Sequence, residues 1–132
     1  PVEILKANWD YYCPRTEHGS SLSACMYALV ACRFGEAEEA YPFFLKSARA
    51  DWDGGGKQWA GLVYIGGTHP AASGGAWKVF AQGFAGLETE NGVPTVHPCL
   101  PEKWKEIRFK CRVGDRLYAI TANHEKGVVE RL

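Results

Sequence analysis

The sequence has no apolar run close to the roughly 20 residues that a helix needs to cross a bilayer. It also has no excess charge of either sign, because its 15 Lys and Arg residues balance its 15 Asp and Glu residues. A neutral chain without a basic stripe does not attract a phosphate backbone or an acidic membrane over long range. We therefore expect neither nucleic acid nor a membrane as a partner.

Metal-ligand spacing is missing as well. The five cysteines are an odd number and include no CxxC pair, which argues against a metal site and against a complete disulfide framework. Cys25 and Cys32 fall on the apolar face of a predicted helix, and Cys111 falls at an inward strand position, where free thiols pack as small hydrophobic groups. We expect five reduced thiols, no bound metal and a cytoplasmic location.

Helical periodicity dominates the first half of the chain. Apolar spacing predicts a helix over 22–34, and Ser20 and Ser21 stand before it as N-cap residues. Gly35 is typical of a helix C-terminus, and a second helix is predicted over 36–50, so the two form an αα-hairpin. The apolar stripe of the first helix comprises Leu22, Met26, Leu29, Val30 and Phe34.

Weaker signals flank this hairpin. Residues 1–18 are expected to be irregular or only briefly helical, since Pro14 bounds any helix before it. Residues 51–76 are rich in glycine, and a long segment without regular structure inside a compact domain is usually functional. A third helix is predicted to start at Ser73 or at the glycines after it. Its apolar stripe comprises Trp77, Phe80, Ala81 and Phe84.

After Leu87 the periodicity changes to that of strands. Asn91-Gly92 predicts a tight hairpin turn, and the alternation over 107–113 predicts a half-buried strand. Further strands are predicted over 116–122 and 128–132, with Gly127 in the turn between them. The predicted fold class is α+β, with helices followed by a small antiparallel sheet. So small a β unit buries little surface and is expected to pack on helices, including helices outside this chain.

Two segments are candidates for anion binding. In the first, Gly19 leaves room beside the backbone, and two serine hydroxyls follow at a helix start, where free N–H groups and the helix dipole favour an anion. An ordinary N-cap, which needs one serine, is the alternative. In the second, His69 lies in a glycine-rich loop just before a helix, and small neighbours leave room for a ligand. A loop histidine in a hydrogen-bonded turn is the alternative there.

The order of these segments resembles the C-terminal end of glycoside hydrolase family 65, which includes maltose, kojibiose, nigerose and trehalose phosphorylases. The resemblance covers nearly the whole chain. It implies that residues 1–87 supply the last helices of an (α/α)6 catalytic barrel with phosphate-binding loops, and that residues 88–132 supply part of a small C-terminal β-sheet domain. The segments that carry it are HGSSLS at 18–23, GTHPAASGGAW at 67–77, GFAGL at 83–87 and HPCLPEKW at 97–104.

The resemblance implies an inverting phosphorylase, which cleaves an α-glucoside with inorganic phosphate to give β-glucose 1-phosphate. Phosphate then replaces the water, and with it the general base, of an inverting hydrolase. The implied ligands are a disaccharide or glucose and phosphate, with phosphate as co-substrate and no cofactor. The implied phosphate-binding residues are Ser20, Ser21 and His69, with His18, Gly19, Gly67 and Thr68 as further loop residues of the substrate site.

The resemblance also implies an incomplete site. The family's general acid is a Glu on an earlier barrel helix, and no Glu here lies in the matching motif, so no catalytic residue is predicted in this chain. The isolated chain is expected to be an inactive fragment. The rest of the barrel is expected from the same longer chain or from a partner chain, and the oligomeric state stays open, with a homodimer as one option. Two departures from the family pattern are Glu17, where a neutral or small residue is expected, and the early end at Leu132.

Two alternatives to the phosphorylase are compatible with parts of the sequence. One is a hydrolase of the same family that uses water, and the retained Ser20, Ser21 and His69 argue against it. The other is a non-catalytic helical-hairpin interaction module, because FGEAEEAYPFFLKSA resembles one tetratricopeptide hairpin. No second copy occurs at a fixed period, and such arrays usually need at least three. The sequence does not identify the α-linkage or the acceptor sugar.

Overall fold

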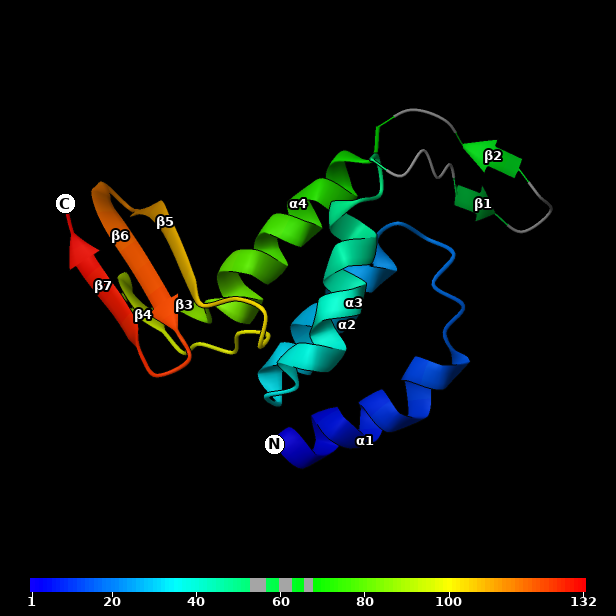
Figure 1. The fold of residues 1–132 in the computed structure, drawn as a ribbon, viewed down its shortest axis with the longest axis horizontal. Coiled ribbons are helices and arrows are strands. Elements are labelled where there is room, and N and C mark those ends of the chain that lie inside the picture. The colour runs from blue at the N-terminus through cyan, green and yellow to red at the C-terminus, as the bar shows by residue number, and fades with distance from the viewer. Residues whose placement is uncertain (53–56, 60–62, 66–67) are drawn as a thin grey trace.

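The computed structural model describes residues 1–52, 57–59, 63–65 and 68–132. Figure 1 shows a helical part followed by small antiparallel sheets, so the predicted α+β class is confirmed. A 3-10 turn, η1 (Cys13–Arg15), follows the first helix, and a π-helical segment, η2 (Val79–Phe84), continues the last one. The four α-helices are α1 (Val2–Tyr12), α2 (Ser23–Arg33), α3 (Ala37–Ala48) and α4 (Pro70–Lys78).

Within the described ranges, the strands form three antiparallel groups. The first pairs β1 (Lys57–Trp59) with β2 (Val63–Ile65), and the second pairs β3 (Leu87–Glu90) with β4 (Val93–Val96). The third is a sheet in the order β5–β6–β7, formed by β5 (Glu106–Val113), β6 (Arg116–Asn123) and β7 (Gly127–Arg131).

The N-terminal segment differs from the prediction. Residues 1–18, expected to be irregular or briefly helical, contain the eleven-residue helix α1. The Trp9 side chain is only 8% exposed. Its ring centroid lies 5.6 Å from that of Tyr27, 5.5 Å from Phe34 and 5.7 Å from Phe43. Tertiary packing therefore stabilises a helix whose local signal is weak.

The glycine-rich segment 51–76 also differs from the prediction. It contains the β1–β2 pair and most of α4, which begins at Pro70 and not at Ser73. Proline is well suited to the first helical position, because its missing N–H is not needed there and its φ is already helical. Residues 53–56, 60–62 and 66–67 of this segment lie outside the described residues.

The predicted α2–α3 hairpin is confirmed, and Gly35 joins the helices with φ +86°, which favours glycine. The predicted apolar face of α2 is confirmed in part. Cys25 and Cys32 are buried, and Leu29, Val30 and Phe34 pack against the core. Leu22 and Met26 differ from the prediction, because they are 50% and 45% exposed. Small side chains at the most buried positions allow the neighbouring helices to approach closely. The buried residues of α2 are Ala24, Cys25, Ala28, Ala31 and Cys32.

The close approach is made by glycines of the last helix. A Cβ added to Gly75 of α4 would overlap the Sγ of Cys25, and one added to Gly83 of η2 would lie 3.1 Å from the Sγ of Cys32. Since both contacts occur in the same order along both helices, α4 and η2 run parallel to α2, as Figure 1 shows. Trp77, predicted on the apolar stripe of this helix, is 56% exposed, while the smaller Ala76 and Val79 are buried.

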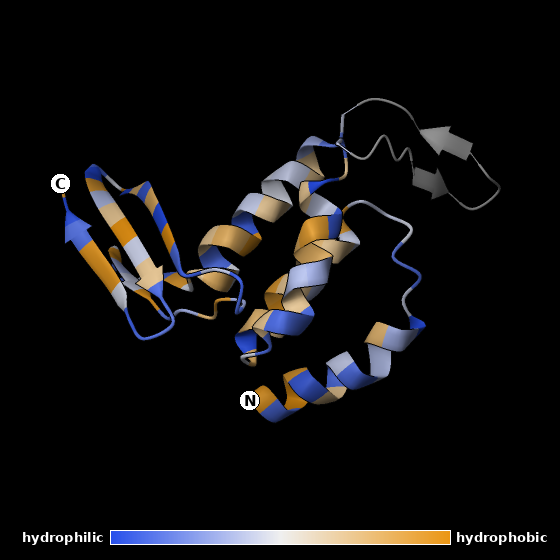
Figure 2. Cartoon of the chain, viewed as in Figure 1, coloured by the Kyte–Doolittle hydropathy of each residue, from blue (hydrophilic) through white to orange (hydrophobic). Residues whose placement is uncertain are grey.

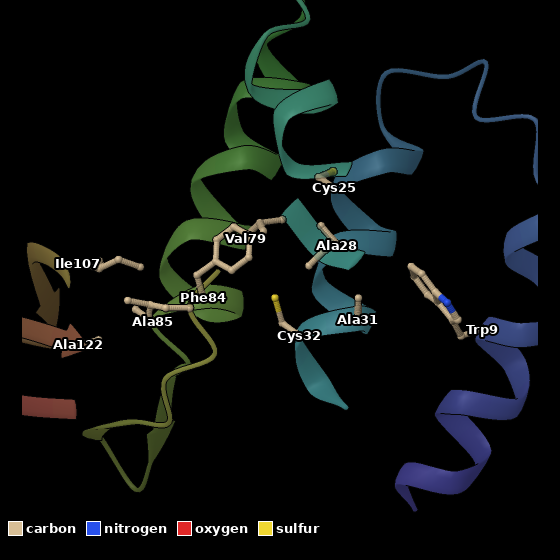
Figure 3. Close-up of a cluster of buried hydrophobic side chains, with 12 residues drawn as sticks. Trp9, Cys25, Ala28, Ala31, Cys32, Val79, Phe84, Ala85, Ile107 and Ala122 are labelled. Atoms are coloured by element: carbon tan, nitrogen blue, oxygen red, sulfur yellow. The ribbon is translucent and has the colours of Figure 1, made fainter. Parts of the chain in front are cut away.

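The core continues from the helices into the sheet (Figure 3). Phe84 is fully buried, and its ring centroid lies 5.3 Å from that of Phe44 and 5.0 Å from Trp104. Ile107 of β5 and Ala122 of β6 belong to the same cluster. The three-stranded sheet therefore packs against the end of η2, as expected for a β unit too small to stand alone.

The predicted strands are confirmed with small shifts of their ends. Apolar and polar residues alternate along β5, and so does their burial (Figure 2). Asn91 and Gly92 have φ +50° and +77°, as a tight hairpin turn requires. Gly127, predicted in a turn, is the first residue of β7. Among the described residues, no helix is both long and apolar enough to span a membrane.

Candidate functional site

Three segments that are distant in the sequence meet at one end of the helices. Because α4 runs parallel to α2, and α3 returns antiparallel to α2, the starts of α2 and α4 lie at the same end as the C-terminus of α3 (Figure 1). Gly19 precedes Cys25 by as many residues as His69 precedes Gly75, and Cys25 and Gly75 are in contact. We call this the loop end of the helices; it comprises residues 18–23, 46–51 and 68–70.

The turn before α2 is held by contacts from two helices. His18 has φ +53°, which is uncommon for a residue with a side chain. Its Nδ1 lies 3.0 Å from the Oγ of Ser23, and its carbonyl oxygen accepts a hydrogen bond from the Nζ of Lys46 at 3.2 Å. A Cβ added to Gly19 would meet no described atom within 4 Å. The room that glycine was predicted to leave beside this backbone is therefore present.

The two predicted serines are not helix caps. The N-cap position of α2 is Leu22, without a side-chain cap. The Oγ of Ser20 accepts a hydrogen bond from the Leu22 N–H at 3.2 Å, which forms a turn ahead of the helix. No hydrogen bond joins the Ser21 hydroxyl to the part of the chain that the structure describes. A capping role is therefore excluded, because the chain turns once more before α2 begins.

His69 is the N-cap residue of α4, and Asp51 holds it at two points. The His69 N–H donates to both carboxylate oxygens, at 2.8 and 2.9 Å, and its Nδ1 lies 2.6 Å from Oδ1. The His69 side chain is 14% exposed. These hydrogen bonds lower the pKa of the Asp51 carboxyl from its ordinary value; the main-chain bond has the larger effect and the ring bond the smaller.

Sequence reasoning missed Asp51 and Lys46 as parts of this end. Asp51 contacts a residue 18 positions away and Lys46 one 28 positions away, so no local pattern reveals either contact. Of the remaining loop residues, Thr68 is exposed and Gly67 lies outside the described residues. Within the described ranges, no three His, Cys, Asp or Glu side chains gather as a metal site would require.

The loop end therefore combines features that suit an oxyanion. Two helices begin there without a side-chain cap, so the positive ends of two helix dipoles lie at this end. Lys46 supplies a cation, and Ser20 and Ser21 supply hydroxyls. The structure places the serines and His69 at the same end of the parallel helices; that their side chains meet around one anion stays a prediction.

Known proteins match both parts of this chain. Residues 1–78 match the model of the glycosyl hydrolase family 65 central catalytic domain, and residues 87–132 match that of the family's C-terminal domain. The nigerose phosphorylase of Lachnoclostridium phytofermentans is 52% identical over 130 residues, which are 98% of this chain and 17% of that protein. The kojibiose phosphorylase of Caldanaerobacter subterraneus subsp. tengcongensis is 37% identical over 132 residues, 98% of this chain and 16% of that protein.

A solved structure matches as well. A protein from the human microbiome, assigned there as a kojibiose phosphorylase, superposes with a TM-score of 0.80 at 25% identity. The match covers 100% of this chain and 19% of that one. The chain thus spans about a sixth to a fifth of the length of the relatives that it matches.

Proposed function

The chain belongs to glycoside hydrolase family 65, and on that premise we propose that it is the C-terminal portion of an inverting disaccharide phosphorylase. The enzyme uses inorganic phosphate to cleave an α-glucoside and releases β-glucose 1-phosphate. The relatives compared above are phosphorylases, which supports this class of enzyme. Phosphate is the co-substrate in this proposal, and no cofactor takes part.

The observation that carries the proposal is the common location of three predicted phosphate ligands. The parallel packing of α2 and α4 brings the turn with Ser20 and Ser21 to the same end as His69. Serine hydroxyls, an imidazole and the starts of two helices can all donate hydrogen bonds to the oxygens of a phosphate. Lys46 adds a positive charge to this end, which offsets the negative charge of the Asp51 carboxylate.

Phosphate held in this way acts as the nucleophile. One of its oxygens forms a bond to the anomeric carbon from the face opposite the leaving sugar, and the glycosidic C–O bond breaks. The leaving oxygen takes a proton from a general acid, which we place in a part of the enzyme outside this chain. An inverting hydrolase needs a carboxylate base to activate water. Phosphate is already anionic, so that base is not needed.

We propose that residues 1–87 complete a helical barrel and that residues 88–132 belong to the C-terminal β domain. An open apolar groove of about 200 Å³ lies between α1 and α2. Met26, one of its lining residues, is 45% exposed. Such a surface fits contact with further barrel helices. The isolated chain is expected to be inactive, because the general acid lies outside it. The groove is lined by Asn8, Trp9, Tyr12, Met26, Tyr27 and Val30.

All five thiols are free, which suits a cytoplasmic enzyme.

The test uses the full-length enzyme with nigerose, kojibiose, trehalose and maltose, with and without inorganic phosphate. We expect at least one disaccharide to be cleaved only when phosphate is present. Proton NMR of the fresh product should show the β anomer of glucose 1-phosphate. Cleavage at the same rate without phosphate would establish a hydrolase, and an α-linked product would contradict inversion.

A further inference from the structure

We propose that Asp51 is the positioning residue for His69 and directs the Nε2 of its imidazole toward the phosphate. The inference rests on the proposed function, because it concerns the same anion site. The carboxylate of Asp51 accepts hydrogen bonds from both the main-chain N–H and the ring Nδ1 of His69. Both the backbone and the side chain of His69 are therefore tied to one group.

The two contacts define the orientation of the ring. A rotation of the imidazole by half a turn would place a carbon atom, in place of Nδ1, against Oδ1 of Asp51 and would lose the 2.6 Å contact. The main-chain bonds keep the start of α4 at a constant distance from the carboxylate. The ring is mostly buried, with 14% of the side chain exposed, so it has little freedom to move elsewhere.

The contacts also define the tautomer. An ionised carboxylate only accepts hydrogen bonds, so the proton of the contact with Asp51 belongs to Nδ1 of His69. The pKa of Asp51 is lowered by these same bonds, which keeps the carboxyl ionised. Nε2 is then the ring atom that faces a ligand. It donates to a phosphate oxygen when the imidazole carries two protons, and accepts from a P–OH group when it carries one.

Asp51 also lies between the two parts of the anion site in the sequence, which are the serine turn before α2 and the loop with His69. It follows the C-terminus of α3, the helix whose Lys46 donates to the carbonyl oxygen of His18 in the turn before α2. One helix end thus contacts both the serine turn and the histidine loop. Lys46 in the last turn of α3 and Asp51 just after this helix thus connect segments from different parts of the sequence.

The first measurement needs no substrate. In the full-length enzyme labelled with ¹⁵N-histidine, the nitrogen shifts show which ring atom of His69 carries the proton, and the signal is assigned by its loss in His69→Gln. We expect the proton on Nδ1 in the wild type and a mixture of tautomers in Asp51→Asn. A neutral wild-type ring protonated at Nε2 would overturn the proposal, even if the variant did not fold.

The second measurement separates positioning from general stability. Asp51→Asn should raise the KM for phosphate about tenfold or more, which is the loss seen when a metal-binding histidine loses its orienting partner. The KM for the disaccharide should stay within about twofold. Asp51→Glu should recover part of the loss, since it restores the charge. Asp115→Asn, in an exposed turn, is the matched control. An unchanged KM for phosphate in Asp51→Asn would overturn the proposal.

The two experiments also separate this inference from the function on which it rests. If the wild-type enzyme shows no phosphate-dependent cleavage, the phosphorylase proposal fails. The tautomer of His69 then still decides whether Asp51 orients the ring. If cleavage depends on phosphate but the KM for phosphate does not respond to Asp51→Asn, only the positioning role is overturned.

Discussion

Gly75 of α4 lies directly against the thiol of Cys25 in α2, with no room for a side chain between the two helices. The contact lets α2 and α4 pack side by side and in parallel, so that the segments preceding them emerge at one end. A helix pair separated by larger side chains would hold the Ser20–Ser21 turn and His69 further apart. The spacing of the proposed phosphate ligands therefore depends on Gly75, which is not itself one of these ligands.

Gly75→Ala should destabilise the full-length enzyme by about 1–3 kcal/mol, because the new methyl group overlaps Cys25 and the helices must separate. The measurement is the shift of the denaturant midpoint. Gly74→Ala is the matched control: its Cβ would meet no described atom within 4 Å, and alanine favours a helix over glycine. Equal stability of the two variants would show that the seam between α2 and α4 tolerates a side chain.

Ser21→Ala should raise the KM for phosphate about tenfold, which corresponds to one lost hydrogen bond to a charged group. Its hydroxyl bonds to no other described residue, so the fold should not change. Steady-state kinetics with phosphate and disaccharide varied separately provide the test. Thr89→Ala, which removes an exposed hydroxyl from β3, controls for hydroxyl loss in general. A change in the disaccharide KM alone would assign Ser21 to the sugar.

The contact between Asp51 and His69 should make a pH-dependent contribution to stability. The pKa of Asp51 is lowered in the folded chain, so its stabilising contribution is fully present above the unfolded pKa of about 3.9 and is lost as the pH falls toward the folded value. Thermal midpoints of the wild type and Asp51→Asn should therefore differ at pH 6 and converge below about pH 4. A difference that widens in acid would have the wrong sign.

Trp9→Ala should cost about 3–5 kcal/mol, the range for removing a buried aromatic side chain. Trp9 is 8% exposed and contacts three aromatic rings of α2, α3 and their connection. Chemical unfolding of the full-length enzyme measures the loss. Tyr11→Ala, at a 56% exposed position of the same helix, should cost far less. Similar losses at both positions would mean that α1 is stabilised mainly by its own sequence.

The candidate site could be predicted only in part. Ser20, Ser21 and His69 were identified from short motifs and from a resemblance, which need no coordinates. Their polar partners were not found, because Asp51 approaches His69 only after α3 and α4 have packed together. The capping role of the serines was wrong for a local reason, since the chain makes one further turn before Ser23.

The sequence by itself determined the features that depend on neighbouring residues. Glycine at position 35 and the Asn91-Gly92 pair adopt positive φ at little cost, so the helical hairpin and the strand hairpin follow from local chemistry. Alternating residues likewise define β5. The tertiary structure decided which side chains of α2 are buried most deeply, that α1 is a full helix, and that Asp51 holds His69. These depend on the sizes and positions of side chains that meet only when distant segments pack.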